Sequence, residues 1–158
     1  MPSLKEIHVI SLGAGVQSST MALMAAQGKL TPMPQYAIFA DTQGEPAWVY
    51  KQIEIMQKFA ESHGIKFKIV TAGNLAQDII DRNNGVKTRC AAIPAFTSNA
   101  KGKSSMLRRQ CTRDYKIRAI EKFIRREVFN NYFQKKIKKD QTADCLIGIS
   151  LDEIQRMK

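Results

Sequence analysis

The sequence predicts a three-layer α/β fold, in which a twisted parallel sheet of about five strands carries helices on both faces. Short apolar, β-branched runs alternate along the chain with longer segments of helical periodicity, and glycine-containing or polar turns separate them. This strand-helix order repeats three times before a further helix and strand, which favours parallel pairing. With 158 residues, 44% of them hydrophobic, the chain suits a single domain over residues 1–158.

The first half of the chain contains three strand-helix units. Its runs of Val, Ile and aromatic residues are typical of buried strands, and its helical segments are bounded by capping Ser or Pro at the start and Gly at the end. The predicted strands are residues 7–12, 36–40 and 65–70, and the predicted helices are residues 18–27, 46–63 and 75–80.

The second half is less regular. Periodicity is lost after residue 83, so residues 84–105 are predicted to form a loop that is functional or mobile. Residues 113–133 then show helical spacing of Ile, Phe and Val, and the apolar run at residues 145–149 predicts a further strand. The chain either closes its domain there or continues into a C-terminal extension.

The turn after the first strand is the most informative segment. A strand that passes through two glycines into a helix exposes backbone N–H groups and the positive end of the helix dipole, and serine hydroxyls add donors. Such a turn predicts phosphate binding, although a tight turn with a serine cap is the simpler alternative. The candidate phosphate-binding residues are Ser11, Gly13, Ala14, Gly15, Gln17, Ser18 and Ser19.

The turn can be compared with the known types of phosphate-binding loop. A Walker A loop is excluded because the turn contains no lysine. A dinucleotide-binding fingerprint is nearly matched by Gly13, Gly15 and Ser18, and Asp41 stands at the end of the second strand where a ribose-binding acid would lie. A Rossmann dinucleotide-binding protein therefore remains an alternative, but it leaves the basic segment of the chain unexplained.

Four segments together resemble one family. They are residues 13–18 (GAGVQS), 39–45 (FADTQGE), 110–118 (QCTRDYKIR) and 146–153 (LIGISLDE). They are similar to motifs of the PP-loop ATP pyrophosphatases and adenine nucleotide alpha-hydrolases, in the phosphoadenosine phosphosulfate (PAPS) reductase-like branch that phages and prophages often encode. The likeness covers nearly the whole chain, and it implies a Rossmann-like three-layer fold.

The resemblance also implies an activity and a set of roles. The ligand would be ATP or PAPS, with cleavage of ATP to AMP and pyrophosphate, adenylation of a substrate, or attack on an adenylyl sulfate. The residues of the first turn would hold phosphates, and Asp41, Thr42 and Gly44 would lie near the adenosine or a metal. Lys116 and Arg113, with Ser18, would be the catalytic residues, the two cations meeting the far phosphate or sulfate.

Departures from the family motif weaken the catalytic prediction more than the binding prediction. Gln17 replaces the aspartate that the pyrophosphatases use near Mg²⁺, and an amide is a poor ligand for this hard cation. Gly13 and Ala14 replace the first Ser and Gly of the motif. The nucleophilic cysteine of the reductases would follow this region, so reduction is not predicted. A non-catalytic nucleotide- or nucleic-acid-binding module is the alternative.

The formal net charge of +11 is concentrated in one segment. Residues 101–139 hold 14 Lys and Arg against 3 Asp and Glu, and the rest of the chain is balanced. These are more cations than one nucleotide needs, which indicates a polyanionic partner such as tRNA or DNA. The rings of Tyr115, Tyr132 or Phe133 would stack on its bases. A solvated helix face is the alternative explanation of the charge. The cations are Lys101, Lys103, Arg108, Arg109, Arg113, Lys116, Arg118, Lys122, Arg125, Arg126, Lys135, Lys136, Lys138 and Lys139.

The remaining chemistry-bearing residues give weaker indications. Cys90, Cys111 and Cys145 show no paired spacing, so they predict neither disulfides nor a zinc site, and Cys145 is expected to be buried in its strand. His8 lies inside a predicted strand and His63 at a helix end, so no metal ligand is predicted. With no secretory signal and no apolar run long enough for a bilayer, a cytoplasmic protein without a membrane partner is expected, and an oligomer is compatible with the sequence.

Overall fold

The computed structural model describes residues 5–87, 93, 95–98, 102–106, 110–132 and 140–152. The strands are β1 Lys5–Leu12, β2 Tyr36–Asp41, β3 Lys66–Thr71, β4 Phe96–Ser98, β5 Ser104–Met106 and β6 Gln141–Ile147. The helices are α1 Val16–Ala26, α2 Ala47–Ser62, α3 Leu75–Asn83 and α4 Arg118–Phe123, the last continuous with the π-helical segments η1 Thr112–Ile117 and η2 Ile124–Val128.

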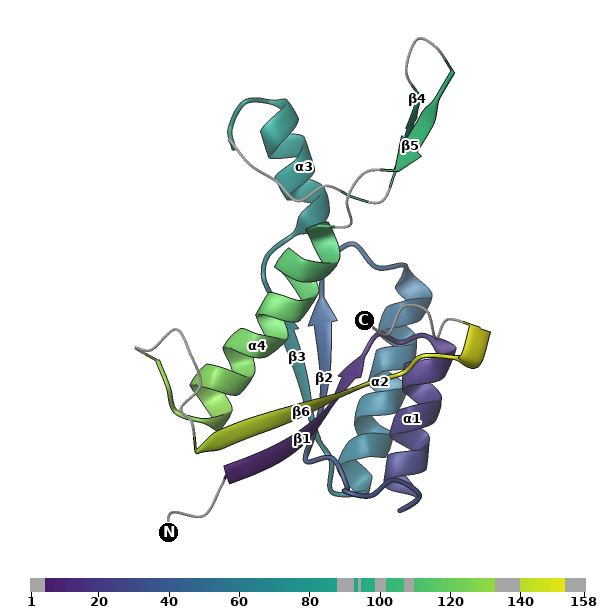
Figure 1. The fold of residues 1–158 in the computed structure, drawn as a ribbon, viewed down its shortest axis with the longest axis vertical. Coiled ribbons are helices and arrows are strands. Elements are labelled where there is room, and N and C mark those ends of the chain that lie inside the picture. The colour runs from purple at the N-terminus through teal and green to yellow at the C-terminus, as the bar shows by residue number, and fades with distance from the viewer. Residues whose placement is uncertain are drawn as a thin grey trace.

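The main sheet is parallel and has the strand order β3-β2-β1-β6. The predicted α/β class and parallel pairing are confirmed, but the sheet has four strands rather than about five. β4 and β5 do not join it, because they pair with each other as an antiparallel hairpin. In Figure 1 this hairpin and α3 lie beyond the carboxyl ends of β2 and β3.

Helices cover both faces of the sheet, as Figure 1 shows for α1 and α2 on one side and α4 on the other. One core contains Ile10, Leu12 and Phe39 together with apolar residues of α1 and α2. The second core contains Val9 and Ile38 together with Ile120, Ile124 and Val128 of the α4 segment. Because successive residues of a strand face opposite sides, the central strands carry apolar residues on both faces, which explains why apolar neighbours such as Val9 and Ile10 follow each other directly.

Several predicted boundaries differ from the structure. Strand β1 begins at Lys5 rather than residue 7, α3 ends at Asn83 rather than residue 80, and α1 begins at Val16, without the predicted serine cap, because Ser18 and Ser19 are buried inside the helix. The expected loop at residues 84–105 contains β4 and the start of β5. The expected helix at residues 113–133 ends at Val128, because Asn130 adopts a left-handed backbone with φ 50°. The last strand begins at Gln141, not at residue 145, since its polar first half lies at the exposed edge of the sheet and carries no apolar pattern.

Within the part of the chain that the structure describes, no helix combines the length and the apolar character that crossing a membrane requires.

Candidate functional site

The candidate site lies at the carboxyl end of the central strand β1. From β1 the chain moves outward to β2 and then β3, but it later returns to place β6 on the other side of β1. The strand order therefore reverses between β1 and β6, and open α/β sheets bind ligands in the crevice at such a reversal. The glycine turn after β1 and the chain that follows β6 both start at this point.

The turn after β1 is held together by Ser18. The Gly13 amide donates a hydrogen bond to Ser18 Oγ at 3.1 Å, and this hydroxyl donates to the Gly15 carbonyl at 3.2 Å. Between the two glycines Ala14 has φ 56°, a left-handed conformation that favours glycine. Ser18, predicted as a phosphate ligand and catalytic residue, is buried and fixes the shape of the turn.

Helix α1 begins in an electropositive setting. No side chain caps it at Gly15, and its first turn carries no acidic residue, so the helix dipole is not offset locally. Ser19, one turn into the helix, is 8% exposed, and among the described residues its hydroxyl has no hydrogen-bond partner. A buried hydroxyl without a partner is costly, so this residue is the best candidate in the turn for a role other than packing.

Gly148 closes the other side of the turn. A Cβ atom at this position would lie 2.7 Å from the carbonyl carbon of Gln17 and 2.7 Å from the amide nitrogen of Ser18. Only a glycine allows the chain after β6 to approach the start of α1 so closely. The turn is therefore formed by two segments together, the one that follows β1 and the one that follows β6.

A second cluster lies at the carboxyl end of β2, next to β1 in the sheet. Thr42 Oγ1 donates to Glu45 Oε1 at 3.2 Å, and Lys116 Nζ in η1 forms an ion pair with the same carboxylate oxygen at 3.0 Å. Asp41 Oδ1 accepts hydrogen bonds from the Tyr50 hydroxyl at 3.0 Å and the Gln43 amide at 2.7 Å. Burial and the bond to Asp41 both raise the pKa of Tyr50, which keeps it a neutral donor.

The structure places the remaining predicted residues in different surroundings. Gly13, Gly15 and Gln17 are exposed on the turn, Gly44 is exposed between Thr42 and Glu45, and Arg113 is exposed in η1. Ser11 does not lie on the turn: it lines an apolar groove of about 350 Å³ between β6 and the α4 segment. It therefore contributes to the opposite face of the sheet from α1.

Two expectations about individual side chains need correction. Cys145 is not a buried core residue but lies exposed on the edge strand β6, where it lines the same groove as Ser11; neighbouring protein atoms still raise the pKa of its thiol, which disfavours a thiolate. Tyr115 is buried and donates a hydrogen bond to Asp78 of α3, so it does not present a ring for base stacking. Cys90 and Phe133 fall outside the described residues.

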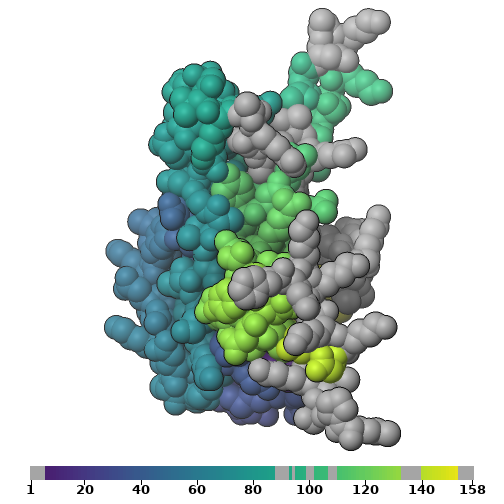
Figure 2. All heavy atoms as spheres, turned by 90° about the vertical axis from the view of Figure 1, so that its left-hand side faces the viewer, coloured from purple at the N-terminus to yellow at the C-terminus, as the bar shows by residue number. Residues whose placement is uncertain are grey.

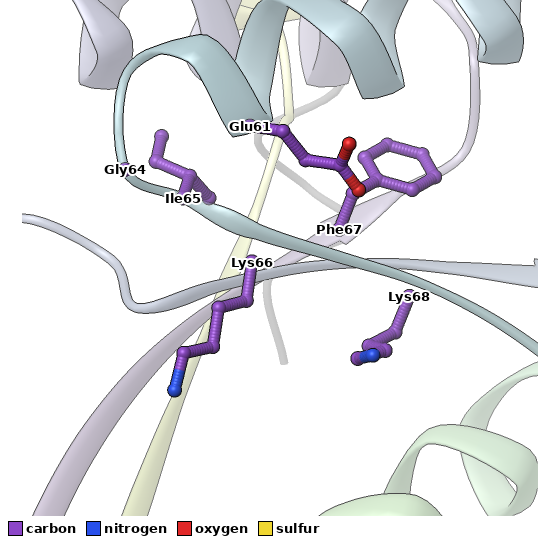
Figure 3. Close-up of a pocket in the computed structure, with 6 residues that line it drawn as sticks. All are labelled: Glu61, Gly64, Ile65, Lys66, Phe67 and Lys68. Carbon is purple, nitrogen blue, oxygen red and sulfur yellow. The ribbon is translucent and has the colours of Figure 1, made fainter.

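A separate shallow pocket of about 250 Å³ lies at the amino end of β3, away from the turn. Figure 3 shows Lys66 and Lys68 pointing away from Glu61 and Phe67, as alternation along a strand requires. The pocket is not part of the candidate site. Its lysines point away from Glu61 and Phe67, and the negative charge of Glu61 would repel an anionic ligand.

The basic segment is described only in part. The helical portion is exposed on the face that Figure 2 shows, in green, with α3 in teal at one end. Lys122 and Arg118 are exposed there, and Arg118 pairs with Asp114 at 2.9 Å. Lys101, Arg108, Arg109 and the lysines at 135–139 fall outside the described residues.

Sequence reasoning assigned no role to Glu45, Tyr50 or Gly148. Gly148 directly follows an apolar strand, which is a signal for close backbone approach, and Glu45 stands in the FADTQGE segment. Tyr50 carries no such signal, because a helix residue nine positions after Asp41 shows no relation to it before the chain folds.

A scan against protein-family models finds no match to this chain, and a search of curated proteins finds none either.

Proposed function

We propose that this chain binds an adenine nucleotide, ATP or PAPS, through its phosphates at the turn between β1 and α1. The observation that carries the proposal is the place of this turn at the reversal of strand order, with an uncapped helix start beside it. The buried Ser19 hydroxyl supports it, because a phosphate oxygen would supply the partner that the described residues do not. The choice of adenine rests on the family resemblance.

The second cluster fits a role at the far phosphates. Lys116 reaches the carboxyl end of β2 and is half-exposed, so it is able to exchange the Glu45 carboxylate for a ligand phosphate. In an adenylation, a nucleophile of the substrate would form a bond to the α-phosphorus while the bond from that phosphorus to the bridging oxygen breaks. Lys116 and the amides of the turn would stabilise the charge on the departing pyrophosphate.

Magnesium, when bound with the nucleotide, would neutralise phosphate charge and polarise the phosphorus. Gln17 is exposed on the turn and offers one amide oxygen, whereas Asp41 and Glu45 offer carboxylates at the next strand end. Glu45 is already paired with Lys116, so we assign Asp41 rather than Gln17 to any metal that accompanies the nucleotide, because a carboxylate suits Mg²⁺.

The decisive experiment compares Ser19→Ala with Ser18→Ala by calorimetric titration with ATP, with and without Mg²⁺. Removing the unpartnered Ser19 hydroxyl should leave the free energy of unfolding unchanged or raise it, yet weaken ATP binding by about tenfold or more. Ser18→Ala should lose both stability and binding, because it breaks both bonds of the turn. Thr20→Ala, exposed on the same helix, is the control. An unchanged ATP affinity in Ser19→Ala would remove the phosphate assignment.

The same samples decide between an enzyme and a binding module. Pyrophosphate release on ATP addition would establish cleavage between the α- and β-phosphates, and its loss in Lys116→Gln would assign that lysine to the reaction. Tight binding without release would identify a module that retains the ligand site alone. NADH binding without ATP binding would favour the dinucleotide alternative.

We also propose a nucleic acid, tRNA or DNA, as a partner of the basic segment at residues 101–139. The supporting observation is that the net charge of the whole chain resides in this segment, whose helical part is exposed beside the candidate site. Such binding would weaken steeply with rising salt.

A further inference from the structure

A cluster of three different metal-ligating side chains lies on the sheet, far along the strands from the glycine turn. Glu6 and His8 are two residues apart on β1 and share one face, and the strand register places Asp144 of β6 directly beside His8. One ligand atom from each of the three side chains lies within 4.8 Å of the others. The cluster lies toward the amino ends of β1 and β6, whereas the proposed nucleotide site lies at their carboxyl ends.

The spacing between His8 and Asp144 suits coordination better than hydrogen bonding. His8 Nδ1 and Asp144 Oδ2 are 3.4 Å apart, which is long for a hydrogen bond between nitrogen and oxygen. Two ligands bound tetrahedrally at zinc distances of about 2.1 Å would themselves be separated by about 3.4 Å.

The backbone at His8 is held in place while the carboxylates remain accessible. The His8 amide donates to Gln35 Oε1 at 2.6 Å, and the His8 carbonyl accepts from the Gln35 amide at 2.9 Å, so the backbone is fixed on the side that faces β2. The His8 side chain is 13% exposed and that of Asp144 is 52% exposed. A cation could therefore enter from the Asp144 side and keep water in its remaining positions.

We propose that Glu6, His8 and Asp144 form a binding site for a divalent transition-metal ion of the zinc class. An imidazole nitrogen favours such ions over Mg²⁺ or Ca²⁺, which prefer oxygen ligands alone. Strand position alone argues against His8 as a ligand, but Asp144 beside it and Glu6 on the same strand face supply the second and third donors that a site requires. The ion would join the central strand to the edge strand β6 and so stabilise the folded state.

The test is a calorimetric titration of the reduced, full chain with Zn²⁺, repeated for Asp144→Asn, His8→Gln and the control His63→Gln. His63 is the other histidine of the chain and lies at the end of α2. One Zn²⁺ should bind the wild type and His63→Gln equally, and both site variants should weaken binding by more than about tenfold. Asp144→Asn keeps the test valid if His8→Gln does not fold, because the Asp144 side chain is half-exposed.

Two companion measurements identify the ligand atoms and the class of ion. The spectrum with Co²⁺ should show nitrogen and oxygen ligands, and a thiolate charge-transfer band would overturn the site by assigning the ion to cysteine. Zn²⁺ should raise the melting temperature of the wild type and Mg²⁺ at equal concentration should not; an equal rise would reduce the effect to charge screening. Absence of Zn²⁺ binding, or binding unchanged in both site variants, would also overturn the proposal.

Discussion

At the scale of single residues, the candidate site depends on two positions that control how closely groups approach. Gly148 lets the chain after β6 touch the first turn of α1, and Glu45 holds Lys116 against the end of β2. The first position sets the shape of the turn, and the second sets how much positive charge is available to a ligand.

Gly148→Ala should deform the turn. Its Cβ would meet backbone atoms of Gln17 and Ser18 at 2.7 Å, and backbone yields less readily than a flexible side chain. We expect a loss of about 1–3 kcal/mol in the free energy of unfolding, measured by urea denaturation, together with weaker ATP binding. Gly44→Ala is the matched control, because its nearest contact would be Thr42 Oγ1 at 4.0 Å; equal destabilisation by both changes would contradict the steric cause.

Glu45→Gln should strengthen nucleotide binding. The carboxylate competes with ligand phosphates for Lys116, and the pair is partly exposed, so we expect affinity to rise about two- to fivefold. Lys116→Gln should instead weaken binding by about tenfold, since it removes a charged donor. Both effects are measured by ATP titration, with Glu61→Gln at the far end of α2 as the control. If Glu45→Gln weakens binding, Glu45 contacts the ligand complex itself.

At the scale of elements, α3 is tied to η1 by a network around Asp78. Its carboxylate accepts hydrogen bonds from Lys87 and from the buried Tyr115, and these bonds hold the pKa of Asp78 below its usual range. Because the pKa is lower in the folded state than in the unfolded state, the stabilisation is present above the unfolded value and disappears as the pH falls through the folded value.

Asp78→Asn should therefore destabilise the protein at pH 7 and have progressively less effect as the carboxylate becomes protonated. The measurement is the difference in free energy of unfolding between wild type and variant at several pH values down to strongly acid conditions. The exposed Asp140 gives the control Asp140→Asn, which lacks this network. A difference that stays constant with pH would mean that packing, and not ionisation, fixes α3.

The elements of the first half could be predicted because local signals and tertiary burial agree there. Central strands carry apolar residues on both faces, and the helices α1, α2 and α3 each end just before a glycine. The start of β6 could not be predicted, because an edge strand tolerates Gln141, Thr142 and Asp144, and the hairpin β4–β5 gives no apolar signal because its residues are exposed. In the site, the turn was predictable from its glycines, whereas Tyr50 and Gly148 depend on long-range contacts.

At the scale of the whole molecule, charge is distributed unevenly. Residues 101–139 hold the whole net charge, and the rest of the chain is balanced in charge. The α4 segment, which belongs to these residues, lies on the face of the sheet opposite α1 and α2. A phosphate-rich polymer would therefore be held along one side of the molecule, beside the cluster that contains Lys116.

Charge reversal at exposed residues of the α4 segment should reduce the salt dependence of nucleic-acid binding. In the double variant Arg118→Glu and Lys122→Glu, the slope of log affinity against log salt should fall by about one for each phosphate that the protein no longer neutralises. The control reverses Lys51 and Lys58, which lie on α2 at the other face and change the net charge equally. Binding is measured with tRNA and with duplex DNA. Equal effects of the two double variants would mean that only the net charge matters, and not its place on the α4 segment.

The contact between Gly148 and the start of α1 also determines when the site can come into being. β1 emerges early in synthesis, yet its neighbour β6 and the glycine that completes the turn emerge only after nearly all of the described chain. Because pairing of such distant strands is slow and long loops must close first, the nascent chain has the turn residues long before it has the turn. The complete turn thus forms at a late step of synthesis, so a chain interrupted before residue 148 would retain the motif without the candidate site.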